Sequence, residues 1–293
     1  MDEQLALNWL SQRMPVGDDC YTLDWSGTNL LLTTDMLHRD SDFPAGASNY
    51  TIGWRSVAVS LSDIAAMGGD PEALVIAYGN SDFERDKLED FISGAEAVCE
   101  KFGARIVGGD LDNHEELTVV TTALGKTTEP VTRQGAEPGE LVAVTGDLGR
   151  TGAALRLFEV GETDRANELF RFEPRVETGM KLAPLASSMM DISDGLARSL
   201  HQLAEVNDLG FRIMADKIPY HPAVDEFSDT QEQKEELGIF TGEDFELLFT
   251  SPEENEFELA RTGATVIGKV TEGGVEIVRG RDISSLKDEG YVH

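Results

Sequence analysis

The sequence predicts a protein of the α/β or α+β class with two domains. Short apolar runs of strand length alternate with longer segments of helical spacing along the whole chain. Its 293 residues suit one large or two ordinary domains. The polar, turn-rich segment Arg133–Glu140 interrupts the alternation, which then restarts. We therefore expect one domain over residues 1–135 and a second over residues 136–293.

In the first half, apolar runs bounded by turn residues predict strands, which we place at residues 20–25, 30–34, 72–79, 105–107 and 117–125. Apolar residues at helical spacing predict helices, which we place at 2–13, 51–67 and 86–102. Gly68-Gly69 and Gly103 end the last two helices. The strand 30–34 is expected to end at Asp35, and the strand 105–107 to lead into a turn at Gly108-Gly109-Asp110.

The second half continues in the same manner. Strands are expected at residues 141–145, 189–192, 211–214, 245–250, 266–270 and 275–278. One helix is expected to begin at Thr151, and another follows Ser193-Asp194-Gly195 and runs through Leu203. The last two strands are close in sequence, and we expect them to pair as a hairpin.

The charge excludes several classes of partner. There are 55 Asp and Glu residues against 24 Lys and Arg, which gives a formal net charge of −31. Bare nucleic acid and anionic membranes would be repelled, so neither is expected as a partner. A phosphate-bearing ligand would need a cation between it and the protein. An acid-rich, lysine-poor surface suits a cytoplasm with molar salt, where the Debye length is about 3 Å.

This composition predicts a halophilic cytoplasmic protein. An acidic protein of a low-salt cytoplasm is the alternative, and unfolding at low salt but not in molar KCl distinguishes the two. The two cysteines, Cys20 and Cys99, make neither a disulfide framework nor a metal knuckle. No apolar run reaches about 18 residues, so we expect a soluble protein with no membrane partner.

Five segments share one design, in which an apolar run or turn ends in aspartate beside glycine or a hydroxyl residue. They are Gly17-Asp18-Asp19, Thr33-Thr34-Asp35, Leu61-Ser62-Asp63, Gly108-Gly109-Asp110 and Asp191–Gly195. Aspartate beside glycine is often only a turn, and acids are abundant here. Asp35 and Asp63, however, follow strongly hydrophobic runs, where burial without a partner is costly. Carboxylates without a histidine or cysteine cluster favour Mg²⁺ over zinc.

Other motifs give weaker signals. Gly125-Lys126-Thr127 and Gly263–Lys269 resemble pieces of a phosphate-binding P-loop, but each lacks a required residue and neither precedes a helix pattern. Asp147–Arg150 opens a helix and is either an anion site or a plain N-terminal turn. No Ser–His–Asp or Cys–His set is indicated. We therefore expect no catalytic acid or base and a nucleophile that comes from a substrate.

Seven sequence motifs together resemble those of a known family. VGDDC, TTDML, VSLSDIAAMGGDPEAL, IVGGD, TRQGAEPGE–LVAVTGDLG, MDISDGLARSL and TGEDFELLF occur in this order. The chain resembles the thiamine-monophosphate kinase family, within the superfamily of aminoimidazole ribonucleotide synthetase and selenophosphate synthetase. The resemblance implies ATP-dependent phosphorylation of thiamine monophosphate to thiamine diphosphate. It also implies an N-terminal sheet domain that forms a homodimer, a C-terminal α+β domain, and ATP bound near the subunit interface.

The resemblance also assigns residues. The implied metal contacts, for several Mg²⁺ ions, are Asp19, Thr33, Thr34, Asp35, Asp63, Asp110, Asp191 and Asp194. The implied ATP contacts are Gly108, Gly109, Asp110, Arg133 and Ser193. The implied substrate contacts are Asp42, Glu243 and Tyr291. Asp42 stands where the family often has histidine, so either Asp42 replaces that contact or His38 reaches in.

Direct phosphoryl transfer agrees with these residues, because it needs positioning and charge neutralisation rather than a covalent enzyme group. Two alternatives remain. One is another ATP-dependent member of the superfamily, resembling aminoimidazole ribonucleotide synthetase or selenophosphate synthetase. The other is a non-catalytic Mg²⁺ or nucleotide-binding regulator. An assay with ATP and thiamine monophosphate distinguishes all three.

Overall fold

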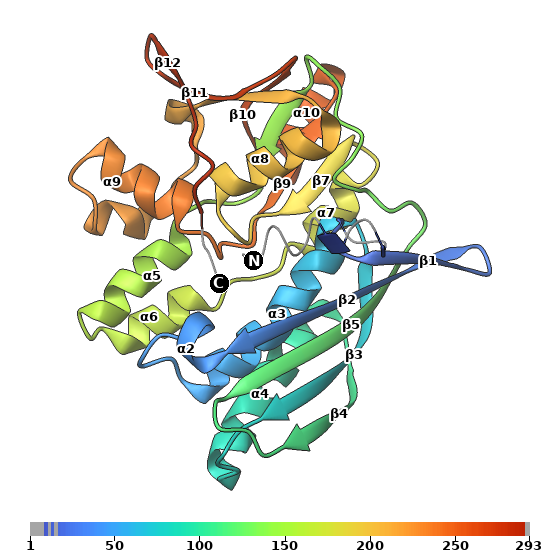
Figure 1. The fold of residues 1–293 in the computed structure, drawn as a ribbon, viewed down its shortest axis with the longest axis vertical. Coiled ribbons are helices and arrows are strands. Elements are labelled where there is room, and N and C mark those ends of the chain that lie inside the picture. The colour runs from blue at the N-terminus through green and yellow to red at the C-terminus, as the bar shows by residue number, and fades with distance from the viewer. Residues whose placement is uncertain (1–8, 11–12, 15–16, 291–293) are drawn as a thin grey trace.

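The structure is a computed structural model that describes residues 9–10, 13–14 and 17–290. Most of the helix expected at 2–13, and Tyr291, lie outside the described residues. Two mixed sheets and the helices packed on them make up the fold (Figure 1). The predicted α/β class with two sheets is therefore confirmed.

The first sheet has five strands in the order β1-β2-β5-β3-β4. Their bounds are β1 Tyr21–Trp25, β2 Thr28–His38, β3 Asp70–Gly79, β4 Ile106–Asp112 and β5 Thr118–Thr127. A short helix, α2 (Arg39–Asp42), follows β2. Two long helices, α3 (Asn49–Ala66) and α4 (Arg85–Phe102), lie along one face of the sheet (Figure 1). We call the other side the open face.

The helices α3 and α4 pack with their backbones almost in contact. A Cβ atom on Gly53 would lie 1.9 Å from the Phe91 carbonyl oxygen, and one on Gly94 would lie 1.9 Å from the Tyr50 carbonyl oxygen. Only glycine permits such an approach. Helix α3 is buried nearly all round, because it is covered by the sheet, by α4 and by the C-terminal half.

The second sheet has seven strands in the order β12-β11-β8-β10-β6-β9-β7. Their bounds are β6 Leu141–Val144, β7 Ser188–Asp191, β8 Gly210–Met214, β9 Leu247–Ser251, β10 Thr265–Thr271, β11 Val275–Arg279 and β12 Asp282–Ser285. The helices of this half are α5 Arg150–Glu159, α6 Thr163–Phe170, α7 Val176–Leu182, α8 Leu196–Asn207, α9 Gln231–Glu235 and α10 Glu256–Thr262. Short 3₁₀ turns at 215–217, 222–226 and 253–255 and a π turn at 236–240 complete it.

The predicted hairpin of the last two long strands is wrong. β8 lies between β10 and β11, antiparallel to the first and parallel to the second. The glycines make room for it: a Cβ on Gly210 would lie 2.2 Å from the Gly273 carbonyl carbon, and Phe211 N donates to Gly274 O (2.8 Å). β11 pairs instead with the following strand β12.

Two strands extend further than predicted. β2 continues through Asp35 to His38, and β4 includes Gly108, Gly109 and Asp110. The reason is the length of their neighbours: β5 pairs with β2 as far as His38, and β3 pairs with β4 as far as Asp112. These aspartates therefore belong to strands and alternate between the faces of the sheet.

The two halves share apolar contacts. The core beneath the first sheet also includes Leu157, Phe170, Phe172 and Phe245 from the second half. The division at residues 135 and 136 stays a prediction.

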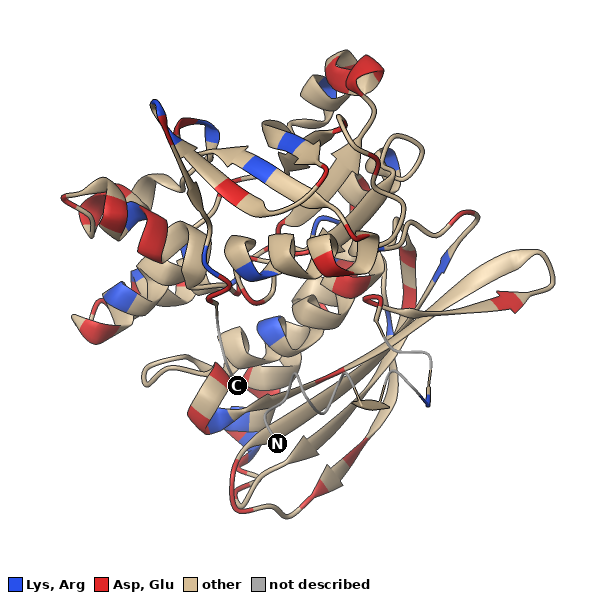
Figure 2. Cartoon of the chain, turned by 45° about the horizontal axis from the view of Figure 1, so that its top comes forward, with Lys and Arg blue, Asp and Glu red and all other residues tan. Residues whose placement is uncertain are grey.

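Acidic residues are spread over helices and loops of both halves (Figure 2). Among the residues that the structure describes, none of the helices has the length and hydrophobicity needed to cross a membrane.

Candidate active site

Three of the predicted aspartates converge beneath the first sheet. Carboxylate oxygens of Asp19, Asp63 and Asp191 all lie within 4.8 Å of one another. Asp19 belongs to the turn before β1, Asp63 to the last part of α3, and Asp191 to the end of β7. We call these three residues the carboxylate cluster. The cluster combines residues from both halves of the chain.

Hydroxyl groups orient the acids. Thr33 donates a hydrogen bond from Oγ1 to Asp63 Oδ2. Ser62 Oγ donates to Asp191 Oδ2, and Ser60 Oγ donates to Asp35 Oδ2, both over 2.6 Å. Ser60 and Ser62 lie on α3, so this helix fixes carboxylates that come from both sheets.

The carboxylates are held in an unfavourable electrostatic environment. Burial raises the pKa of Asp191 to about 8, and the charge of Asp19 adds to this effect. Burial also raises the pKa of Asp35 to about 6 and that of Asp63 well above its usual value, with Asp35 and Asp191 contributing to the latter. Hard oxygen ligands that repel one another in this way fit a hard divalent cation, and Mg²⁺ is the ion that such ligands suit best.

Arg133 is the cation beside the cluster. Its Nη2 lies 2.6 Å from Asp19 Oδ1, and its backbone N donates to Asp18 Oδ1 over 2.8 Å. Burial lowers the pKa of Arg133, but the charges of Asp19 and its neighbours outweigh this and raise it. Asn207 fixes the backbone of the Arg133–Gly135 segment. Its side chain donates to Arg133 O (2.9 Å) and accepts from Gly135 N (2.8 Å).

Other predicted residues stand apart from the cluster. Thr33 and Asp35 point toward α3, whereas Thr34 points to the open face, where its hydroxyl lies 3.0 Å from that of Thr122. Asp110 pairs with the exposed Ala77 and shares the open face. Gly109 is three strands away from Asp35, a distance of about 14 Å.

Gly108, Gly109 and Asp110 instead border a groove between α4 and the edge strand β4. It has a volume of about 460 Å³ and is otherwise lined by apolar side chains, including Tyr78, Phe91, Ile92 and Leu111. A Cβ on Gly109 would lie 2.0 Å from the Ile76 carbonyl oxygen, so glycine is needed for these strands to pair. Within one chain, the predicted ATP contacts therefore fall into two groups, with Arg133 and Ser193 near the cluster.

The Ser193-Asp194-Gly195 and Gly242–Phe245 turns are linked. Glu243 N donates to Ser193 O (2.5 Å), and Phe245 N donates to Ile192 O (3.0 Å). Gln202 Nε2 reaches Asp194 Oδ2 at 3.4 Å. The implied ATP contact Ser193 and the implied substrate contact Glu243 are thus neighbours, close to the ends of the strands β7 and β9.

Asp42 and Glu243 both lie near Arg55, a buried residue of α3. Arg55 Nη2 lies 3.3 Å from Glu243 Oε2. Burial lowers the pKa of Arg55, and the charges of Glu243 and Asp42 oppose this. His38 points away, because its Nδ1 lies 3.1 Å from Thr118 Oγ1 on the open side of the sheet. The geometry therefore favours Asp42 over His38 as a neighbour of Glu243.

The helix that opens at Asp147–Arg150 is already capped. Gly149 N and Thr151 N donate to the Asp244 carboxylate over 2.6 and 2.9 Å. Burial raises the pKa of Asp244 to about 7, although these two hydrogen bonds act against the shift. The anion at this helix terminus is the chain's own carboxylate. This favours a plain N-terminal turn over a binding site for an external anion.

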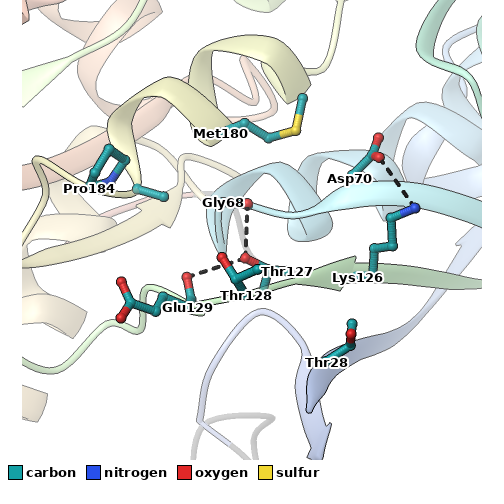
Figure 3. Close-up of a pocket in the computed structure, with 10 residues that line it drawn as sticks. Thr28, Gly68, Asp70, Lys126, Thr127, Thr128, Glu129, Met180 and Pro184 are labelled. Carbon is teal, nitrogen blue, oxygen red and sulfur yellow. Dashed lines mark hydrogen bonds and ion pairs between the residues drawn. The ribbon is translucent and has the colours of Figure 1, made fainter. Parts of the chain in front are cut away.

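Both P-loop look-alikes have other roles. Gly125-Lys126-Thr127 belongs to β5, and Gly263 ends α10. A cavity of about 500 Å³ lies beside Lys126, bordered by the turn after α3 and by α7 (Figure 3). Lys126 is paired with Asp70 (3.8 Å) and Glu72, and Thr127 Oγ1 donates to Gly68 O (3.3 Å). None of the described residues around this cavity is a predicted site residue.

Sequence reasoning missed Arg55, Ser60, Ser62 and Asn207. Arg55 could have been found, because it is the only charged residue in the apolar stretch from Thr51 to Ser62. A lone charge on a buried helix face needs a partner. Nothing in the sequence marks Asn207, whose role depends on a contact with residues 71 to 74 positions away.

The fold and the carboxylate-lined site define a protein of the AIR synthase related superfamily. The family model described as "AIR synthase related protein, N-terminal domain" matches residues 17–127, and its C-terminal counterpart matches residues 137–281. More specifically, the chain belongs to the thiamine-monophosphate kinase family. This confirms the resemblance stated from the sequence motifs.

The relatives are similar over nine-tenths or more of their lengths. The thiamine-monophosphate kinase of Halobacterium salinarum is 44% identical, with 100% of both chains covered. That of Methanospirillum hungatei is 42% identical over 94% of this chain and 92% of its own. A solved structure of AaThiL complexed with AMPPCP and TMP superposes with a TM-score of 0.86 at 28% identity, covering 99% of this chain and 95% of that one. The Halobacterium relative agrees with the halophilic composition.

Proposed function

We propose that this chain catalyses the ATP-dependent phosphorylation of thiamine monophosphate to thiamine diphosphate. The observation that carries the proposal is the carboxylate cluster of Asp19, Asp63 and Asp191 beside Arg133, in a chain that belongs to this family. The terminal phosphoryl group moves from ATP to a phosphate oxygen of thiamine monophosphate, and ADP leaves. That phosphate is ionised at neutral pH, so the reaction needs no catalytic base.

Magnesium is proposed as the resident cation, with several ions per site. The residues proposed to hold it are Asp19, Thr33, Thr34, Asp35, Asp63, Asp110, Asp191 and Asp194. When bound, Mg²⁺ supplies charge neutralisation and Lewis-acid polarisation of phosphate oxygens. The chain's own part is to present carboxylates already oriented by Thr33, Ser60 and Ser62, and to add the positive charge of Arg133.

ATP is proposed to bind through Gly108, Gly109, Asp110, Arg133 and Ser193, and the substrate through Asp42, Glu243 and Tyr291. The apolar groove between α4 and β4 suits the base of a nucleotide, because its rings Tyr78 and Phe91 lie beside a glycine-lined strand edge. We also propose that the protein acts in the cytoplasm.

A homodimer through the open face is part of the proposal. This face carries large exposed apolar side chains, namely Tyr21, Leu23, Trp25, Leu32, Met36 and Val75. Contiguous exposed apolar surface on a sheet marks an interaction site. Pairing two such faces would bring Asp110 and Thr34, which stand apart from the carboxylate cluster in one chain, to the boundary between subunits.

Val75→Glu is expected to convert the dimer into a monomer and to abolish turnover. Val75 lies on the open face of β3, between β5 and β4, and is 40% exposed, so a buried unpaired charge at a subunit contact would be costly. Light scattering after size-exclusion chromatography in molar KCl measures the change. Phe257→Glu on α10, at a side chain that is 72% exposed, is the matched control and should leave the mass unchanged. A dimeric Val75→Glu protein would contradict the proposed interface.

The test of the activity is an assay with ATP, Mg²⁺ and thiamine monophosphate in molar KCl, scored for thiamine diphosphate and ADP. Formation of both in equal amounts is expected. ADP without thiamine diphosphate would point instead to another ATP-dependent activity of the superfamily. Neither product would favour a non-catalytic nucleotide-binding protein.

A further inference from the structure

Arg55 is a buried cation that the proposed reaction does not use. Arg55 is 1% exposed and lies within α3. The guanidinium carbon lies 3.8 Å from the ring centroid of Phe170 and 5.1 Å from that of Phe172, and Nη1 donates to Phe170 O over 2.7 Å. A buried charge is unfavourable unless it is paired and hydrogen-bonded. Its presence in the stretch of α3 from Thr51 to Ser62, which holds no other charged residue, therefore needs an explanation.

Its partner belongs to a strained turn. Arg55 Nη2 lies 3.3 Å from Glu243 Oε2, and Phe245 is also near the guanidinium, at 5.7 Å from ring centroid to carbon. Glu243 has φ 58° and Phe245 has φ 52°, the left-handed region that side chains other than glycine rarely adopt. Such a conformation costs about 1–3 kcal/mol per residue and persists only when its surroundings impose it.

Two further contacts fix the backbone of the same turn. Glu243 N donates to Ser193 O over 2.5 Å, and Thr151 Oγ1 donates to Glu243 O over 2.7 Å. These contacts hold the main chain, whereas Arg55 pairs with the carboxylate. Arginine suits this place because its planar group can stack on Phe170, donate to a carbonyl and face a carboxylate at once.

We propose that Arg55 is a positioning residue that holds the Gly242–Phe245 turn in its left-handed conformation and aims the Glu243 carboxylate at the substrate. The inference rests on the proposed function and deepens it. Arg55 and Ser62 are seven residues, or two turns, apart on one face of α3. Ser62 orients Asp191 and Arg55 orients Glu243, so one helix sets both the metal-binding and the substrate-binding carboxylates of the C-terminal half.

The first test compares kinetics of Arg55→Met with those of Arg279→Met. The control removes another arginine, Arg279 on β11, which is paired with a buried glutamate, Glu235. We expect Arg55→Met to raise KM for thiamine monophosphate by about tenfold or more, with KM for ATP within about twofold of wild type. Arg279→Met should change neither KM. Where Arg55→Met does not fold, Arg55→Lys, which keeps the charge but not the planar stack, takes its place.

The second test does not depend on activity. The Glu243 amide proton, bonded to Ser193 O, is expected to exchange with solvent about tenfold faster in Arg55→Met than in wild type, and at the wild-type rate in Arg279→Met. Unchanged KM for thiamine monophosphate and unchanged exchange would overturn the inference, as would an equal rise in both KM values. If wild type makes no thiamine diphosphate, the proposed function fails, while the exchange rate still decides whether Arg55 holds the turn.

Discussion

Replacing Asp63 by Asn is expected to lower kcat for thiamine diphosphate formation by about a thousandfold or more. Asp63 is the member of the carboxylate cluster on α3, with oxygens within 4.8 Å of those of Asp19 and Asp191. The amide keeps the shape and the hydrogen bond from Thr33, but it removes one negative charge from the proposed metal site. Turnover should stay low at saturating Mg²⁺, because the lost ligand charge cannot be replaced from solution.

The same variant should not be less stable without metal. Burial, and then the charges of Asp35 and Asp191, raise the pKa of Asp63. The ionised form of Asp63 is therefore repelled by the neighbouring carboxylates in the folded protein. The Asp63→Asn substitution relieves the repulsion, and the midpoint of thermal unfolding in EDTA should equal or exceed that of wild type. The rise in midpoint on adding Mg²⁺ should shrink. Asp216→Asn, at an exposed position of the 215–217 turn, is the control. Near-normal turnover of Asp63→Asn would refute the metal assignment.

The metal-free protein is expected to lose stability as the pH rises from about 5 to about 8. Asp191 has its pKa raised to about 8 and Asp35 to about 6, from an ordinary value of 3.8. At a pH between the pKa of these acids in the unfolded chain and their pKa in the folded protein, the folded protein binds more protons than the unfolded chain. The free energy of unfolding therefore falls with rising pH. Each pKa unit corresponds to about 1.4 kcal/mol, which gives a loss of about 3–6 kcal/mol.

Chemical unfolding in EDTA at constant molar KCl measures this slope. Saturating Mg²⁺ should flatten it, because the bound cation favours the ionised carboxylates. Asp244, with its pKa raised to about 7, adds a smaller slope of the same sign that Mg²⁺ does not remove. Asp191→Asn provides the internal check, since it should flatten the slope without metal. A metal-free protein whose stability rises over this pH range would contradict the account of the cluster.

The elements that could be predicted from the sequence are those whose signal is local. The helices α3 and α4 follow from apolar spacing and their terminal glycines, and the strand β3 follows from its apolar run. The β10–β11 pairing could not be predicted, because β8 enters between them from about 50 residues earlier. Local sequence gives no sign of a strand inserted from elsewhere, beyond the glycines that make space for it.

The candidate site shows the same limit. The sequence motifs predict Asp19, Asp63 and Asp191 as metal contacts, and the structure brings their carboxylates together. Asp35 and Asp110 share one design in the sequence, an apolar run or turn that ends in aspartate, yet they face opposite sides of the sheet. Which face a strand residue occupies depends on register, and a register one residue away would exchange the two sides. Arg55 escaped notice because a charged residue in a helix is usually taken as surface.

The order of strands in the second sheet has a consequence for synthesis of the protein. β6 is buried at all four residues and lies between β9 and β10, which follow it by about 100 residues. Until the ribosome has released those strands, β6 has both hydrogen-bonding edges open, and β7 lacks its neighbour β9. Open apolar edges are where chains aggregate. Fragments that end before Leu247 should therefore accumulate as insoluble material, and shielding of the nascent β6 by a chaperone should matter more for this protein than for one built of consecutive hairpins.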